Sequence, residues 1–243
     1  MNPFNVDKIY CLCLDKREAL WKDLQKDCFS RGWDFTPFIA GDGSNPSLAY
    51  DLIDHTYDNF NPNYWGYGVP TGKINHYNAF RCHQEMIKQC KQEGVKSVLM
   101  LEDDSYIPQR FDNIYKCIID KTDISESKYL LDDFDLLYLG WWQWEVDEFG
   151  KHAGRNLTIE DNWNRKGIWG IGRVSQVGGL HGVIITEKMF DIILNFPAIN
   201  PVDFQINQYG HHRLRSYCVY PKMIGLKSCY SETEKAFYER DNL

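Results

Sequence analysis

The sequence lacks the features that mark several classes of protein. It contains no apolar run approaching the roughly 20 residues that cross a bilayer, and the segment from Met1 to Lys8 has neither a basic nor an apolar stretch. Basic residues are also few, with 27 Lys and Arg against 34 Asp and Glu and a net charge of -7. Nucleic-acid and anionic-membrane surfaces need a basic patch. We therefore expect a cytoplasmic protein with no membrane span and no nucleic-acid partner.

Paired cysteines are missing too, because none of the 8 cysteines forms a C-x-x-C motif. This argues against a zinc or redox site, and in a cytoplasmic protein the cysteines are expected to pack as small buried hydrophobes. A chain of 243 residues with 43% hydrophobic and 25% charged content is typical of a globular protein. We expect one domain over residues 1–243, with a nucleotide-binding half at 1–104 and an acceptor-side half with a C-terminal tail at 105–243.

Hydrophobic periodicity predicts alternating strands and helices. Apolar residues at helical spacing predict four helices, which cover residues 20–28, 74–93 and 111–119 and a short segment with Met189, Phe190, Ile193 and Leu194 that follows Thr186. Short apolar runs predict strands, which include Ile9–Leu14, Trp33–Ile39, Val98–Leu101, Phe134–Leu139, Val183–Thr186 and Tyr217–Tyr220. This order predicts an α/β domain with a mixed, mainly parallel central sheet flanked by helices.

The apolar run Val98–Leu101 is the most informative stretch, because three acids follow it directly. A short unbroken apolar run is typical of a strand buried on both faces. Ligands of open α/β sheets collect beyond the carboxyl ends of the strands, so Glu102, Asp103 and Asp104 are expected to face a divalent cation and a phosphate-bearing substrate. Oxygen ligands suit Mg²⁺ or Mn²⁺. The alternative is an ordinary solvated acidic turn.

Strand alternation assigns different roles to these acids. It predicts that Glu102 and Asp104 point to one side, toward the metal, and that Asp103 points to the other. Asp103 would then meet the sugar or a neighbouring backbone N–H. His181 and His211 are candidates for completing the metal shell. His83 lies in an apolar helical stripe and is expected to be a core residue.

Aromatic and polar residues at other strand ends supply further candidates. Trp141 and Trp142 follow the predicted strand Phe134–Leu139 and could stack on a sugar ring, although core packing is the alternative. Asp42, in a turn-rich loop, could contact a nucleotide base or ribose, or be an ordinary turn acid. Asp15 follows the first predicted strand, where it is expected to cap the next helix.

Several segments, in order, resemble the glycosyltransferases of family 25, which include bacterial lipooligosaccharide galactosyltransferases, collagen galactosyltransferases and related viral enzymes. The resemblance spans about residues 8–205. The segments that carry it are Asp15-Lys-Arg17, Gly72-Lys-Ile74, Val98-Leu-Met-Leu-Glu-Asp-Asp104, Gly182-Val-Ile-Ile-Thr186 and Pro201-Val-Asp203. One difference is that the family usually carries Ser-His where this chain has Ala79 and Phe80, so the sugar and acceptor specificity does not carry over.

The resemblance implies a GT-A fold, in which a divalent ion (Mn²⁺ or Mg²⁺) bridges the diphosphate of a UDP-sugar to the acidic motif. It also places Asp203 near the acceptor, where a carboxylate would take the hydroxyl proton in an inverting transferase. The candidate catalytic residues are then Asp203 and Asp103, and the metal candidates are Glu102, Asp104, His181 and His211. The candidate donor-binding residues are Asp15, Arg17, Asp42, Lys73, Asn75, Trp141 and Trp142.

The expected activity is the metal-dependent transfer of a hexose from a UDP-sugar to a glycan or glycoprotein acceptor. Transfer from a nucleoside diphosphate needs a Lewis acid on the departing phosphates more than it needs a side-chain acid. A metal-dependent phosphohydrolase or nucleotidyltransferase could use the same acid-tipped strand. A carbohydrate-binding module is the non-enzymatic alternative, with tryptophans on the sugar and the acids around a structural ion.

Overall fold

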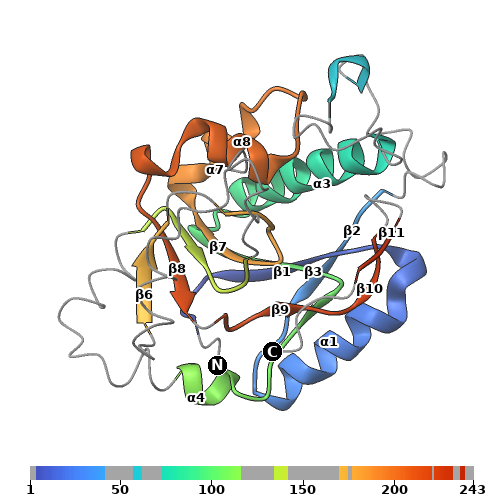
Figure 1. Cartoon of the computed structure of the whole chain (residues 1–243), viewed down its shortest axis with the longest axis vertical. Helices are drawn as coiled ribbons and strands as arrows, with labels where there is room; N and C mark the ends of the chain where they lie inside the picture. The colour runs from blue at the N-terminus through green and yellow to red at the C-terminus, as the bar shows by residue number, and fades with distance from the viewer. Residues whose placement is uncertain are drawn as a thin grey trace, which may run out of the picture.

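The computed structural model describes residues 4–41, 57–61, 73–115, 134–141, 170–174, 177–220, 222–231 and 236–238. Its central sheet has seven strands in the order β2-β1-β3-β7-β5-β8-β6 (Figure 1). The strands are β1 (Lys8–Cys13), β2 (Thr36–Ile39), β3 (Ser97–Glu102), β5 (Leu136–Tyr138), β6 (Gly170–Arg173), β7 (Gly182–Thr186) and β8 (Ser216–Tyr220).

The sheet is mixed and mainly parallel, as predicted. Strand β1 pairs in parallel with β2 and β3, and β5 pairs in parallel with β8. Strand β7 runs antiparallel to both β3 and β5, and β6 runs antiparallel to β8. Five of the seven strands therefore share one direction, and β6 and β7 oppose it. The carboxyl ends of β1 and β3 consequently lie side by side at one edge of the sheet.

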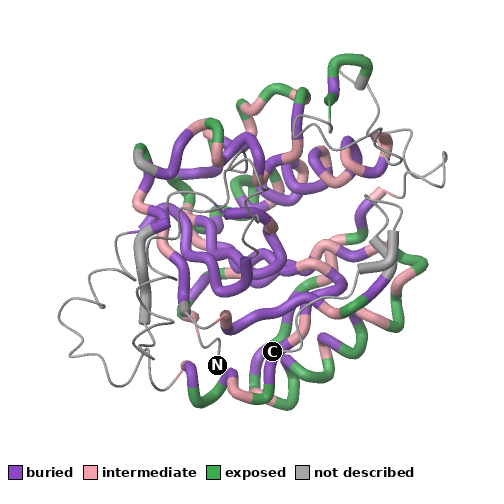
Figure 2. The backbone as a smooth tube through the Cα atoms, in the orientation of Figure 1, coloured by how far each residue is buried: buried purple, intermediate pink, exposed green. Residues whose placement is uncertain are grey.

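Helices cover both faces of this sheet (Figure 1). On one face lie α3 (Lys73–Gln92), α7 (Glu187–Leu194) and α8 (Val202–Tyr209), and on the other lie α1 (Glu18–Ser30) and α4 (Phe111–Tyr115). Figure 2 shows that burial is concentrated in the sheet and on the inner sides of these helices. Among the helices of the described segments, none is both long and apolar enough to cross a membrane.

Strand β3 contributes to two separate hydrophobic cores, because its side chains alternate between the faces. Val98 and Met100 pack with α3, α7 and α8 in one core. Leu99 and Leu101 pack with α1 and α4 in the other. All four side chains are buried. The prediction of a strand buried on both faces is therefore confirmed.

Shorter elements surround the sheet. The 3-10 helices are η1 (Asp15–Arg17), η2 (Tyr57–Asn59) and η5 (His211–Arg213). Two small antiparallel pairs join β4 (Ser105–Tyr106) with β9 (Gly225–Leu226) and β10 (Cys229–Ser231) with β11 (Ala236–Tyr238). The β4–β9 pair brings the C-terminal segment against the acidic turn that follows β3.

Two sequence predictions about helices need correction or completion, and one helix was not predicted. Asp15 does not cap α1: it begins η1, and the N-cap position of α1 belongs to Arg17, without a side-chain hydrogen bond. Helix α8 was missed, although Pro201 before its first turn is a common start signal. The predicted helix over 111–119 is confirmed as far as Tyr115, and the rest lies outside the described residues.

Candidate functional site

The acidic segment is a tight turn fixed to a neighbouring strand. Strand β3 ends at Glu102. The next two residues, Asp103 and Asp104, form a turn, and β4 begins at Ser105. The Ser105 hydroxyl accepts a hydrogen bond from the Glu102 N–H at 3.1 Å and donates one to the His181 carbonyl oxygen at 2.8 Å. The turn is thereby attached to the residue that precedes β7.

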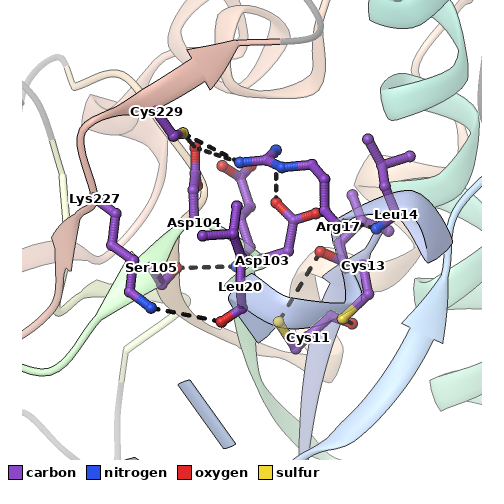
Figure 3. A network of polar contacts seen from close by, with 12 residues as sticks. Cys11, Cys13, Leu14, Arg17, Leu20, Asp103, Asp104, Ser105, Lys227 and Cys229 are labelled. Atoms are coloured by element: carbon purple, nitrogen blue, oxygen red, sulfur yellow. Dashed lines mark hydrogen bonds and ion pairs between the residues drawn. The ribbon is translucent and has the colours of Figure 1, made fainter. Parts of the chain in front are cut away.

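Asp103 joins the ends of β1 and β3 through a buried ion pair (Figure 3). Its Oδ1 lies 2.8 Å from Arg17 Nη1, and its Oδ2 accepts the Leu14 N–H at 3.1 Å. Burial lowers the pKa of the Arg17 guanidinium, but the charges of Asp103 and Asp104 outweigh this and raise it overall. Arg17 thus stays charged and compensates the buried acids.

Asp104 has one carboxylate oxygen engaged and one without a hydrogen bond. Its Oδ2 lies 3.7 Å from Arg17 Nη2 and 3.5 Å from the Cys229 sulfur, which in turn accepts a hydrogen bond from Arg17 Nη2 at 3.1 Å. Oδ1 is buried and has no hydrogen-bond partner in the described structure. A buried carboxylate oxygen left in this way is costly unless a donor or cation reaches it.

One alternative and one prediction about the acids are wrong. Asp103 and Asp104 are 5% and 7% exposed, so the segment is not a solvated turn. The extended geometry also ends at Glu102, because the next two residues turn. Asp103 and Asp104 therefore share Arg17 as partner instead of pointing to opposite sides. The backbone N–H predicted as a partner of Asp103 is present, at Leu14.

Glu102 belongs to a different environment, on the α3 side of the sheet. Its carboxylate is about one-third exposed, and Oε1 lies 3.8 Å from Nε2 of His83. His83 is buried in α3, and its Nδ1 lies 2.6 Å from the Ala79 carbonyl oxygen. Burial lowers the pKa of His83, opposed by that hydrogen bond and by the Asp203 charge. The ring is therefore neutral at pH 7.

Asp203 is held at the start of α8 by two backbone groups. Its Oδ1 accepts the Phe204 N–H at 2.9 Å, and its Oδ2 accepts the Gly179 N–H at 3.1 Å. Its charge is close enough to raise the pKa of buried Tyr138, although burial is the larger cause. Each carboxylate oxygen can accept a further hydrogen bond in addition to the backbone N–H it already binds.

The histidines proposed as metal ligands are both deeply buried. His211 Nε2 donates to Asn207 Oδ1 at 3.0 Å, and burial lowers the pKa of His211 to about 4. The His181 ring packs against Gly140, where an added Cβ would come within 2.8 Å of its Cδ2. The described segments contain no group of three His, Cys, Asp or Glu side chains that could hold a metal alone. The predicted four-residue metal site is therefore not assembled within them.

Trp141 is a core residue, which corrects its prediction as a sugar platform. It is 1% exposed, its Nε1 donates to the Val219 carbonyl at 3.1 Å, and Lys222 Nζ lies 4.9 Å from the ring centroid. A ring covered in this way offers no face to a pyranose. Trp142 lies outside the described residues, as does Asp42.

The other donor-side candidates occupy scattered positions. Asp15 is exposed in η1, two residues before Arg17. Lys73 Nζ donates to the Asp58 carbonyl at 3.2 Å, and Asn75 is buried in the first turns of α3. Among the predicted donor residues, Arg17 forms ion pairs with the acidic turn.

Sequence reasoning missed two residues beside the acids. No local sequence pattern placed Cys229 near the acids. It is distant from Asp104 in the chain, and it lies in β10, just after β9, where its sulfur contacts Asp104. His83 was predicted as a core residue, and it is buried. Its position on the face of α3 toward β3 could have suggested its proximity to Glu102.

Comparisons with known proteins leave the family open. No family model matches the sequence, and no curated protein matches it. Solved structures that are distantly similar include the following two. The crystal structure of A197 from STIV has 12% identity and a TM-score of 0.40, covering 97% of this chain and 96% of that one. A glycosyltransferase involved in the glycosylation of the major capsid of PBCV-1 has 12% identity and a TM-score of 0.34, covering 76% of this chain and 63% of that one.

Proposed function

We propose that the protein is a glycosyltransferase that uses a UDP-sugar and a divalent cation to glycosylate a glycan or glycoprotein. The observation that carries the proposal is the buried Asp103–Asp104 turn at the carboxyl ends of β1 and β3, with Oδ1 of Asp104 lacking a hydrogen bond within the described residues. Ligands of α/β sheets bind at such strand ends. The resemblance of the surrounding segments to glycosyltransferase family 25 supports the same reaction class.

The oxygen atoms available as metal ligands suit a divalent cation that also binds phosphate. Asp104, through Oδ1, and Glu102, through its partly exposed carboxylate, would hold the ion. Both offer oxygen ligands, and a site with few protein ligands leaves positions for diphosphate oxygens and water. When bound, the cation would neutralise the charge that develops on the departing nucleoside diphosphate.

The protein's own residues supply the remaining functions. Arg17 fixes Asp103 and partly neutralises the acids, which keeps the turn compact before the donor binds. Asp203, held by the Gly179 and Phe204 N–H groups, is the candidate that accepts the proton of the acceptor hydroxyl. In this mechanism Asp103 is a positioning residue, because both of its oxygens are engaged by Arg17 and Leu14.

Isothermal titration calorimetry with UDP, with and without Mn²⁺, tests the proposal. A transferase of this type should bind UDP tightly only in the presence of the metal, and it should slowly hydrolyse one member of a panel of UDP-, GDP- and dTDP-sugars. Release of inorganic phosphate from a nucleotide alone would favour a phosphohydrolase. Binding of free sugar without any nucleotide binding would favour a carbohydrate-binding module, for which the buried Trp141 gives no support.

A further inference from the structure

The buried imidazole of His83 has its lone pair close to a carboxylate. Nδ1 lies 2.6 Å from the Ala79 carbonyl oxygen, and a carbonyl only accepts hydrogen bonds, so Nδ1 carries the hydrogen. In the neutral ring Nε2 is then an acceptor. His83 is 6% exposed, and this nitrogen has no hydrogen-bond partner within the described chain. It lies 3.8 Å from Oε1 of Glu102.

Nε2 of His83 is a buried acceptor without a hydrogen-bond partner in the described chain, and a positive or hydrogen-donating group between it and the Glu102 carboxylate would satisfy it. Leaving a buried acceptor unsatisfied costs about 1–3 kcal/mol, and here a negative charge lies beside it. The tautomer points to a metal ion, because metal-bound histidines commonly donate their other ring N–H to a backbone carbonyl. The distance of 3.8 Å between His83 Nε2 and Glu102 Oε1 also permits a bound metal ion, because an ion that lies about 2.1 Å from each of these two atoms can bridge them.

We infer that His83 Nε2 and the Glu102 carboxylate bind a divalent transition-metal ion between them, in preference to Mg²⁺. An imidazole ligand favours transition metals, whereas Mg²⁺ prefers oxygen ligands alone. Glu102 faces His83 on the α3 side of β3 and directly precedes the turn that carries Asp104, the other residue proposed to hold this ion. The partly exposed side of Glu102 leaves positions for water or phosphate oxygens.

This inference deepens the proposed function, because Glu102 is one of the two residues assigned to the cation of the donor. It adds His83, which was predicted from the sequence to be a core residue, as a nitrogen ligand. Metal binding by His83 and Glu102 does not itself require a nucleotide, so it can be measured without the transfer reaction.

Pulsed electron paramagnetic resonance of Mn²⁺ added to the purified full-length chain tests the inference directly. Without nucleotide, the bound ion should show modulation from an imidazole ¹⁴N nucleus. Competition titrations should show Mn²⁺ and Zn²⁺ binding more tightly than Mg²⁺. A bound Mn²⁺ signal with no nitrogen modulation, or no bound Mn²⁺ at all, would overturn the inference. This measurement uses the wild-type protein and does not depend on any variant folding.

Variants then identify the ligands. His83→Gln should remove the nitrogen modulation and weaken Mn²⁺ binding by about 10-fold or more, since even outer-shell changes cost 10- to 100-fold. Glu102→Gln should weaken binding similarly but leave the modulation of any residual bound ion. The control is His76→Gln, on the same helix and only half-buried, which should bind Mn²⁺ as the wild type does. Unchanged modulation in His83→Gln would assign the nitrogen to another histidine and sink the inference.

The two proposals can fail separately. If no nucleotide binds or no sugar is transferred, while the His83-dependent nitrogen signal is present, the glycosyltransferase proposal fails and the metal site stands. If UDP binding and transfer occur with a bound metal that shows no imidazole nitrogen, the metal site fails and the transferase stands.

Discussion

Arg17 Nη1 and Asp103 Oδ1 lie 2.8 Å apart, and both side chains are largely shielded from solvent. The pair joins the turn after β1 to the turn after β3, and Asp103 also accepts the Leu14 N–H. A buried ion pair of this kind adds little to folding stability compared with a well-packed apolar pair. Removing one partner, however, leaves an uncompensated buried charge, which is destabilising. Arg17 is therefore required for the fold around the acids.

Replacing Arg17 by Met should lower the free energy of unfolding by about 3–5 kcal/mol, the usual cost of breaking a buried pair. The measurement is urea denaturation followed by circular dichroism. Lys22→Met is the control, since Lys22 forms an exposed pair with Glu18 on α1 and should cost about 0.5 kcal/mol or less. Adding Asp103→Asn to Arg17→Met should recover part of the loss. A cost of Arg17→Met no larger than that of the control would contradict the structural role of the pair.

Replacing Asp104 by Asn should abolish Mn²⁺-dependent UDP binding with little loss of stability. The metal-free variant could even gain stability, because one of two adjacent buried carboxylates is removed and repulsion falls. Calorimetry with Mn²⁺ and UDP together measures the binding. Asp27→Asn, an exposed acid on α1, serves as the control. Wild-type affinity for both ligands in the Asp104 variant would remove the metal assignment and much of the transferase proposal.

Replacing Asp203 by Asn should reduce turnover by about 100-fold while leaving donor binding unchanged, the scale expected for a general base. The amide can still accept one backbone N–H, but its NH₂ group would face the other donor, so a stability loss of about 1–3 kcal/mol should accompany the change. Steady-state kinetics and thermal denaturation separate the two effects. A melting temperature that falls while turnover per folded molecule stays normal would leave Asp203 with a structural role only.

His211 should make the fold sensitive to mild acid. Its pKa falls from 6.5 to about 4 in the folded protein. Between these values the unfolded chain binds a proton that the native chain does not, so the free energy of unfolding falls as pH drops from about 7 to 4. The group accounts for about 3 kcal/mol of this loss, at about 1.4 kcal/mol per pKa unit. Urea denaturation across this range should show a shallower pH dependence in His211→Gln. Parallel curves for the two proteins would refute the assignment.

Local patterns predicted most of the architecture, but not the partners of the acids. The apolar run before Glu102 and the stripe of α3 are each set by residues close in sequence, and both predictions are confirmed. The side to which Asp104 points depends on where the strand ends, and β3 stops before Asp103. The strand alternation assumed for these residues therefore predicted the wrong side for Asp104.

Contacts between distant segments were also beyond local reasoning. Arg17 was predicted on the donor side but not as the partner of two acids, and Cys229 had no pattern at all. Trp141 shows a different limit, since an aromatic residue after a strand can line a binding site or fill a core with the same local sequence. The Val219 carbonyl and Lys222, both far along the chain, determine which occurs here.

The two-sided packing of β3 also constrains how the gene for this protein can change. Inserting or deleting one codon within Ser97–Glu102 would exchange the side chains that face the two cores and would rotate Glu102 away from His83. Substitutions of similar volume leave that register intact. Among homologues that keep this site, we expect the distance in sequence from Ser97 to Asp104 to be invariant even where the residues themselves differ.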